Sequence, residues 1–76
     1  MNSDDMKAGV RVRVNKKLRK GTKGLLVKQH HLDVRKVGVA GTLKSHVPGH
    51  GGDVWFVQHE NSEVVGAYCY DELDKL

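Results

Sequence analysis

Hydrophobic and polar residues alternate strictly in segment 9–14 of the chain. Val10, Val12 and Val14 fall on one face of this segment, and Arg11 and Arg13 fall on the other. A period of two is typical of a β-strand with one buried and one exposed face. The pattern therefore predicts a first strand with its valines in the core and its arginines in solvent.

Four further segments have the composition of strands. Residues 25–27 are apolar and follow a polar, basic loop over 15–23, which predicts a second strand. Residues 37–43 place Val37, Val39 and Leu43 on one period-2 face, with Gly41 marking a bulge or bend. Segments 53–59 and 64–70 are rich in aromatic and β-branched residues and flank a polar turn, which predicts a hairpin.

The end of the chain and its strongest turn signal complete this pattern. Residues 71–76 are too few for an independent helix and predict one helical turn or a final bridge that packs Leu73, with Leu76 as a second candidate. The glycine-rich stretch 45–52 around Pro48 predicts a mobile loop. Short strands separated by turns at intervals of about 8 to 12 residues predict an all-β fold, a five-stranded SH3-like barrel with a short terminal helical turn.

The length of the chain, 76 residues, predicts one domain. Residues 1–8 begin polar and acidic and predict a disordered tail, and residues 9–76 predict the barrel. A domain this small buries only about 60% of the surface that its unfolded chain exposes. A deep substrate cleft would take up most of such a core, so we expect a binding protein rather than an enzyme, with a site shared between subunits as the alternative.

Cysteine usage and hydropathy bear on the compartment. Cys69 is the only cysteine, which excludes an internal disulfide and favours a reducing environment. The N-terminus lacks the pattern of a signal peptide, and no apolar run approaches the roughly 18 residues of a membrane span. We therefore expect a cytoplasmic protein without membrane contact.

The charges divide unevenly along the chain, although the net charge is only +4. Residues 1–38 hold eleven Lys and Arg against three acidic residues, and residues 39–76 hold two against six. If the fold keeps these halves on different faces, one face attracts polyanions such as RNA or DNA. Folding could equally interleave the two halves.

The candidate nucleic-acid site follows from this charge distribution. Its cations lie on the first strand and the loop after it, where they could contact phosphates, and one aromatic residue could stack on bases. The candidate residues are Arg11, Arg13, Lys16, Lys17, Arg19, Lys20, Lys23 and Trp55. The alternative interpretation is a solvated basic face that maintains solubility.

The four aromatic residues, Trp55, Phe56, Tyr68 and Tyr70, could form a stacking platform or the core. Strand alternation sends Trp55 and Phe56 to opposite faces. We expect Phe56 to be buried and Trp55 to be partly exposed.

The sequence contains no clear motif for a metal site or for catalysis. Five histidines are present, but no Cys-x-x-Cys or His-Glu-x-x-His frame accompanies them, so we expect no metal and no cofactor. We expect Cys69 to be a small buried residue of the core. A catalytic pair of Cys69 and His59 across the last hairpin is conceivable, but nothing in the sequence distinguishes such a pair from ordinary packing. No nucleophile stands beside a base in the sequence.

Two motifs resemble known small barrels. Val12-Arg13-Val14 followed by Lys20-Gly21-Thr22-Lys23-Gly24-Leu25-Leu26-Val27 resembles the KOW pattern of ribosomal and transcription-factor barrels, which implies binding to RNA or a ribonucleoprotein. The segments His30-His31, Leu32-Asp33-Val34, Gly38-Val39-Ala40-Gly41-Thr42-Leu43 and Tyr70-Asp71-Glu72-Leu73 resemble the ferredoxin-thioredoxin reductase variable chain. That resemblance implies a non-catalytic subunit that docks on a redox partner.

A third resemblance concerns type II dihydrofolate reductase, a barrel that works as a tetramer. Its Val-Gln-Ile-Tyr motif falls at Val65-Gly66-Ala67-Tyr68, where the glutamine that reads the ligands is missing. The leading hypothesis is therefore a non-enzymatic module that binds RNA or DNA through its basic first strand and loop. A protein-docking accessory subunit and an oligomeric enzyme are the alternatives.

Overall fold

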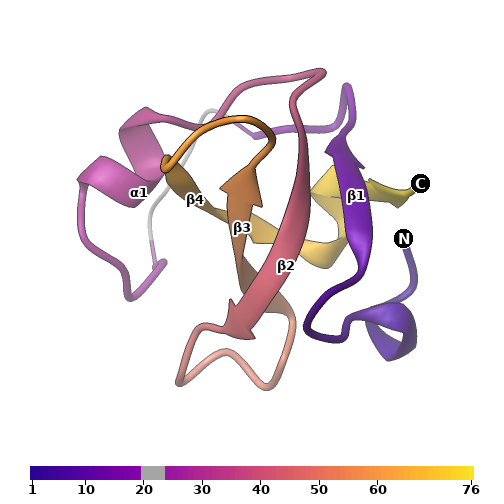
Figure 1. Ribbon diagram of the computed structural model, residues 1–76. Coiled ribbons are helices and arrows are strands. Elements are labelled where there is room, and N and C mark those ends of the chain that lie inside the picture. Colours follow the sequence, from indigo (N-terminus) through magenta and orange to yellow (C-terminus); the bar gives the residue numbers. More distant parts are fainter. Residues whose placement is uncertain (20–23) are drawn as a thin grey trace.

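The computed structural model describes residues 1–19 and 24–76, and five β-strands dominate it (Figure 1). The strands are β1 (Arg11–Val14), β2 (Ala40–His46), β3 (Val54–His59), β4 (Val65–Cys69) and β5 (Leu73–Lys75). Helical structure is limited to single turns, which are η1 (Ser3–Asp5), α1 (His30–Asp33) and η2 (Tyr70–Glu72). The predicted all-β fold with five strands is confirmed.

The strands form one antiparallel sheet in the order β4-β3-β2-β1-β5. The last strand returns to the first, and Val14 lies opposite Leu73 in this pairing. The strands β4 and β5 lie at the two ends of the sheet, and only the 3-10 turn η2 connects them in the chain. The sheet therefore curls to bring its two ends close together. Within the part of the chain that the structure describes, no ladder joins these two strands, so the barrel-like sheet is not closed.

One predicted strand is wrong, and its place is taken by another segment. Residues 25–27 form no strand; Leu25 and Val27 are half-buried in a loop, and Leu26 is 70% exposed. The two inward side chains pack on the outer face of β3 and β4, so their hydrophobicity anchors a loop instead of a strand. The fifth strand is β5, where Leu73 is fully buried and Leu76 is exposed.

The main core lies on the concave side of the sheet. As predicted from the alternation, Val12 and Val14 of β1 are buried and the arginines between them are exposed. They pack with side chains from every other strand and from the N-terminal segment: Met6, Leu43, Trp55, Val57, Tyr68 and Leu73. Within residues 1–8, predicted to be a disordered tail, Ser3–Asp5 form η1 and Met6 lies in this core with 7% of its surface exposed.

The prediction for Trp55 and Phe56 is wrong, because their faces are exchanged. Trp55 lies opposite Tyr68 on the concave side and is only 9% exposed. Phe56 lies opposite Ala67 on the outer face, where it is half-buried beneath His31, at 4.9 Å between ring centroids. A second small core on this face fixes the orientation of β3, because it supplies an apolar cover for Phe56.

The bulge predicted at Gly41 lies further along β2. The register shift between β2 and β3 lies between Leu43 and Ser45. A Cβ atom at Gly41 would lie 2.4 Å from the carbonyl oxygen of Gln58, so glycine is needed where β2 approaches β3 closely.

Candidate nucleic-acid interface

The predicted basic residues that the structure describes separate into two groups, those paired with acids and those that line a groove. Lys20 and Lys23 lie outside the described residues. Arg11 Nη2 lies 2.6 Å from Glu60 Oε1, and Arg19 forms an ion pair with Asp71, so these two cations already have acidic partners. The remaining three predicted cations, Arg13, Lys16 and Lys17, line a common groove.

Folding interleaves the basic and acidic halves of the chain. The ion pairs among residues 1–19 and 24–76 are Arg11 with Glu60, Arg19 with Asp71, and Arg35 with Glu72, and each joins residues 1–38 to residues 39–76. The proximity of Asp71 raises the pKa of the Arg19 guanidinium, with burial acting in the opposite direction. The positive potential is therefore reduced at these sites and persists at the cations of the groove.

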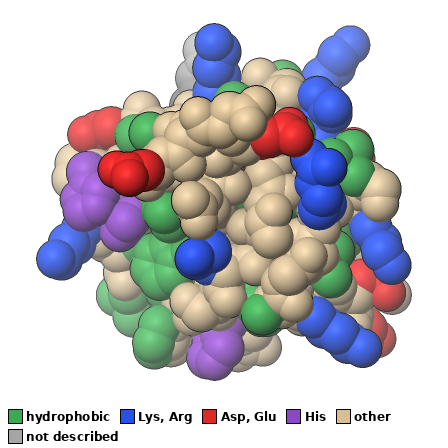
Figure 2. Space-filling view, in the orientation of Figure 1, with side chains coloured by type: hydrophobic (Ala, Val, Ile, Leu, Met, Phe, Trp, Pro, Cys, Tyr) green, Lys and Arg blue, Asp and Glu red, His purple; other side chains and the backbone are tan. Residues whose placement is uncertain are grey.

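The groove lies beside the end of β1 and encloses about 520 Å³. Its walls are the loop 15–17 that follows β1 and the turn 36–38 that precedes β2. Its lining consists of Met1, Arg13, Val14, Asn15, Lys16, Lys17, Val37, Gly38 and Asp74. In the space-filling view, Lys and Arg side chains gather at the right, over β1, and hydrophobic side chains are most visible at the lower left (Figure 2).

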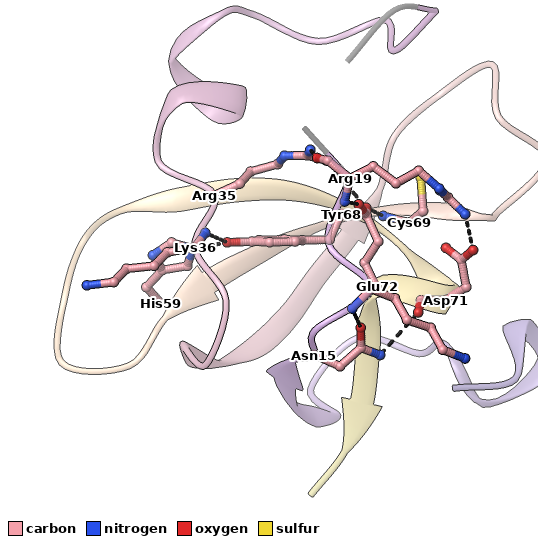
Figure 3. A network of polar contacts seen from close by, with 10 residues as sticks. Asn15, Arg19, Arg35, Lys36, His59, Tyr68, Cys69, Asp71 and Glu72 are labelled. Carbon is pink, nitrogen blue, oxygen red and sulfur yellow. Dashed lines mark hydrogen bonds and ion pairs between the residues drawn. The ribbon is translucent and has the colours of Figure 1, made fainter. Parts of the chain in front are cut away.

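The first wall is fixed by hydrogen bonds to the turn η2. Asn15 N donates to the Glu72 carbonyl at 2.9 Å, and Arg19 N donates to Glu72 Oε2 at 2.8 Å (Figure 3). Between them, Lys17 N donates to Asn15 Oδ1 at 2.8 Å. The loop that carries Lys16 and Lys17 is therefore held at both ends by one residue.

Glu72 is a buried carboxylate that the sequence interpretation missed. It is fully buried, and it also accepts hydrogen bonds from Cys69 N at 2.8 Å and from Arg35 Nη1 at 3.3 Å. Arg35 is buried as well, and its guanidinium donates to the Arg19 carbonyl and lies 5.9 Å from the centre of the Tyr68 ring. The spacing of Cys69 and Glu72 matches a capping box, the sequence signal that could have found this carboxylate.

The second wall is held by the buried pair Tyr68 and His59. Lys36 N donates to Tyr68 Oη at 3.3 Å, and the same oxygen lies 2.9 Å from His59 Nε2 (Figure 3). Gly38, in a left-handed conformation with φ of 88°, accepts from Arg13 Nη1 at 3.0 Å. Burial lowers the pKa of His59 and raises that of Tyr68, so both side chains are neutral near pH 7.

Trp55 and Cys69 do not line the groove. Trp55 is buried in the core, and its indole Nε1 donates to the Gly52 carbonyl at 2.9 Å. Cys69 is half-buried on the outer face of β4, where burial raises the pKa of its thiol, whereas His59 lies on the concave side. The conceivable pair of Cys69 with His59 is therefore not formed, and His59 contacts Tyr68 instead.

Two of the other histidines have structural contacts. His31 Nδ1 lies 2.8 Å from the Val65 carbonyl, which can only accept, so the ring is the donor and covers the edge of β4. His50 Nε2 accepts from Leu26 N at 3.1 Å. Within residues 1–19 and 24–76, no three His, Cys, Asp or Glu side chains come together as metal ligands.

Comparisons with known proteins add no relative to this description. No protein-family model matches the sequence, and no curated protein or solved structure matches the chain. Among the residues that the structure describes, no helix has the length and apolar character needed to cross a membrane.

Proposed function

We propose that this protein is a non-enzymatic binding module that holds nucleic acid by its phosphates in the groove beside β1. The observation that carries the proposal is the convergence of Arg13, Lys16 and Lys17 on one groove while neighbouring cations are paired with acids. Lys and Arg bind phosphate through charge-assisted hydrogen bonds and by release of counterions.

The positions of these cations favour a preorganised site. Arg13 donates to the Gly38 carbonyl through one nitrogen, which orients a guanidinium that has further N–H groups. Lys16 and Lys17 are exposed on a loop whose backbone is bonded to Glu72. A site whose backbone is already ordered loses less conformational entropy when a ligand binds.

The buried polar groups favour binding over catalysis. His59 and Tyr68, which contact each other, are 8% and 0% exposed and are packed in the interior of the sheet. A substrate in the groove would meet the backbone of the turn 36–38 before it reached either side chain.

The test is a titration of labelled oligonucleotides at several salt concentrations with a matched pair of variants. The triple substitution Arg13→Gln, Lys16→Gln and Lys17→Gln should weaken binding and make the slope of log affinity against log salt shallower by up to about 3, about one unit for each lost phosphate contact. The control replaces Lys7, Lys28 and Lys44 by Gln, because these cations are also exposed but lie outside the groove.

Both triple variants lower the net charge equally, so the comparison separates a local site from a general attraction. The control should retain most of the affinity and the slope of the unmodified protein. Equal losses in the two variants, or no salt-sensitive binding by the unmodified protein at low ionic strength, would refute the proposal.

A further inference from the structure

Asp74 is an acidic residue inside the basic groove. It lies on β5 directly opposite Arg13 of β1, and its side chain lines the groove together with Arg13, Lys16 and Lys17. In the part of the chain that the structure describes, Asp74 forms no ion pair with these cations. The carboxylate therefore does not serve as the partner of the arginine that faces it.

The hydrogen bonds show how the two groups are kept apart. Arg13 Nη1 donates to the Gly38 carbonyl at 3.0 Å, on one wall of the groove. Asp74 Oδ1 accepts from Asn15 Nδ2 at 3.2 Å, on the other wall. Asn15 Nδ2 also donates to the Asp71 carbonyl at 3.1 Å, so the amide that positions Asp74 is itself fixed. Among the described residues, no hydrogen bond reaches Asp74 Oδ2.

A carboxylate at this position selects between kinds of anion. It repels a phosphate, so a ligand that offers only negative charge is bound less well because of Asp74. It attracts the exocyclic amino group of a nucleobase, since carboxylates accept hydrogen bonds from cytosine N4 and the equivalent amino groups. Thymine and uracil present a carbonyl oxygen at that position and are disfavoured.

The shape and lining of the groove suit one base. Its volume of about 520 Å³ falls within the range of small-ligand sites, and Met1 and the 46% exposed Val37 give it apolar surface. A whole base can enter the groove only when it is unpaired, because in a duplex each base is stacked and paired inside the helix. The basic rim supplies the charge complementarity for the phosphates on either side.

Building on the proposed function, we infer that the groove binds an unpaired base with an exocyclic amino group, with Asp74 as its acceptor and Lys16 and Lys17 on the adjoining phosphates. Asp74 is then the residue that determines specificity. Single-stranded RNA and DNA share this chemistry, and parallel titrations with both distinguish them through the 2′-hydroxyl.

The experiment measures binding of single-stranded oligocytidine and oligothymidine of equal length at neutral pH by fluorescence anisotropy, with oligocytidine and oligouridine RNA as the second arm. The unmodified protein should bind the cytosine strands about fivefold or more tightly than the thymine or uracil strands. Asp74→Asn should abolish that preference and bind the thymine strand and heparin more tightly, because a repelling charge is removed.

Glu63→Gln is the matched control, since Glu63 is exposed, lies outside the groove and carries the same charge. It should leave the cytosine preference intact. The preference of the unmodified protein is a test in itself, so the result does not depend on the folding of the Asp74 variant.

The possible failures are distinguishable. If every strand binds with the same affinity and Asp74→Asn tightens all of them alike, the inference about the base is wrong and phosphate binding stands. If no oligonucleotide binds, both proposals are wrong. Tighter binding of polyglutamate than of any oligonucleotide would identify an acidic protein as the occupant and overturn both.

Discussion

At the scale of single residues, the buried carboxylate of Glu72 has the most connections. The two carboxylate oxygens accept hydrogen bonds from Arg19 N, Arg35 Nη1 and Cys69 N. The backbone carbonyl of Glu72 accepts a further one from Asn15 N. Two of the three donors to the carboxylate are backbone N–H groups, those of Arg19 and Cys69, and an apolar replacement of the Arg35 and Glu72 pair would leave them without an acceptor. For this reason the general tolerance of buried ion pairs to hydrophobic replacement should not extend to this pair.

Replacing Glu72 by Gln tests this role. The amide keeps the size of the side chain but directs an NH₂ group toward donors, and it leaves Arg35 buried without its counterion. The free energy of unfolding, measured with urea, should fall by about 3 kcal/mol. Glu60→Gln breaks the exposed pair with Arg11 and should cost no more than about 1 kcal/mol. Similar losses in the two variants would contradict the assigned importance of Glu72.

The sequence could predict single residues only where the neighbouring sequence determines their surroundings. The burial of Val12 and Val14 follows from alternation within one strand, and this prediction is confirmed. The pairing of Arg11 and Arg19 with acids depends on partners 49 and 52 positions away, which no local pattern contains. In the same way, the cations of the groove could be named as candidates from the sequence, whereas their neighbours Val37 and Asp74 are brought there by folding.

At the scale of elements, strands with a strong local pattern were predictable, whereas for the short strand β5 the sequence left a helical turn and a final bridge as alternatives. The segments that form β1, β3 and β4 were predicted to within about two residues, since each has a strong pattern of its own. By contrast, β5 has three residues and exists through its pairing with β1 at the other end of the sequence. The apolar residues 25–27 were misassigned because packing on the outer face of the sheet needs the same side chains as a strand.

The contact between β2 and β3 gives a prediction at this scale. Gly41→Ala would place a methyl group 2.4 Å from the Gln58 carbonyl oxygen and 2.8 Å from Val57 Cγ1, so the two strands must separate. The free energy of unfolding should fall by about 2 to 3 kcal/mol, as in other overpacked sites. Thr42→Ala, the adjacent position in the same strand, should cost no more than about 1 kcal/mol. A Gly41→Ala variant as stable as the unmodified protein would show that the strands do not approach this closely.

At the scale of the whole molecule, His59 joins three parts of the fold. It belongs to β3, lies opposite Gly41 of β2 in the sheet, and contacts Tyr68 of β4, which in turn holds the turn 36–38 through Lys36 N. Burial lowers the pKa of His59 below its ordinary value of 6.5. Protonation of this one ring therefore disturbs the core and one wall of the proposed binding groove together.

The expected pH dependence follows from this shift. Below the unfolded pKa of 6.5, the unfolded chain binds a proton at His59 that the folded protein does not bind, so stability falls as the pH decreases toward the folded pKa. The urea midpoint of the unmodified protein should therefore drop between about pH 7.5 and about pH 5.5. His59→Gln retains a polar partner for Tyr68 but cannot be protonated, so its midpoint should drop less over the same interval. His46→Gln is the control, because His46 is exposed and should retain the full drop. If His59→Gln loses stability with decreasing pH as steeply as the unmodified protein, the pH dependence arises at other groups and His59 does not couple protonation to folding.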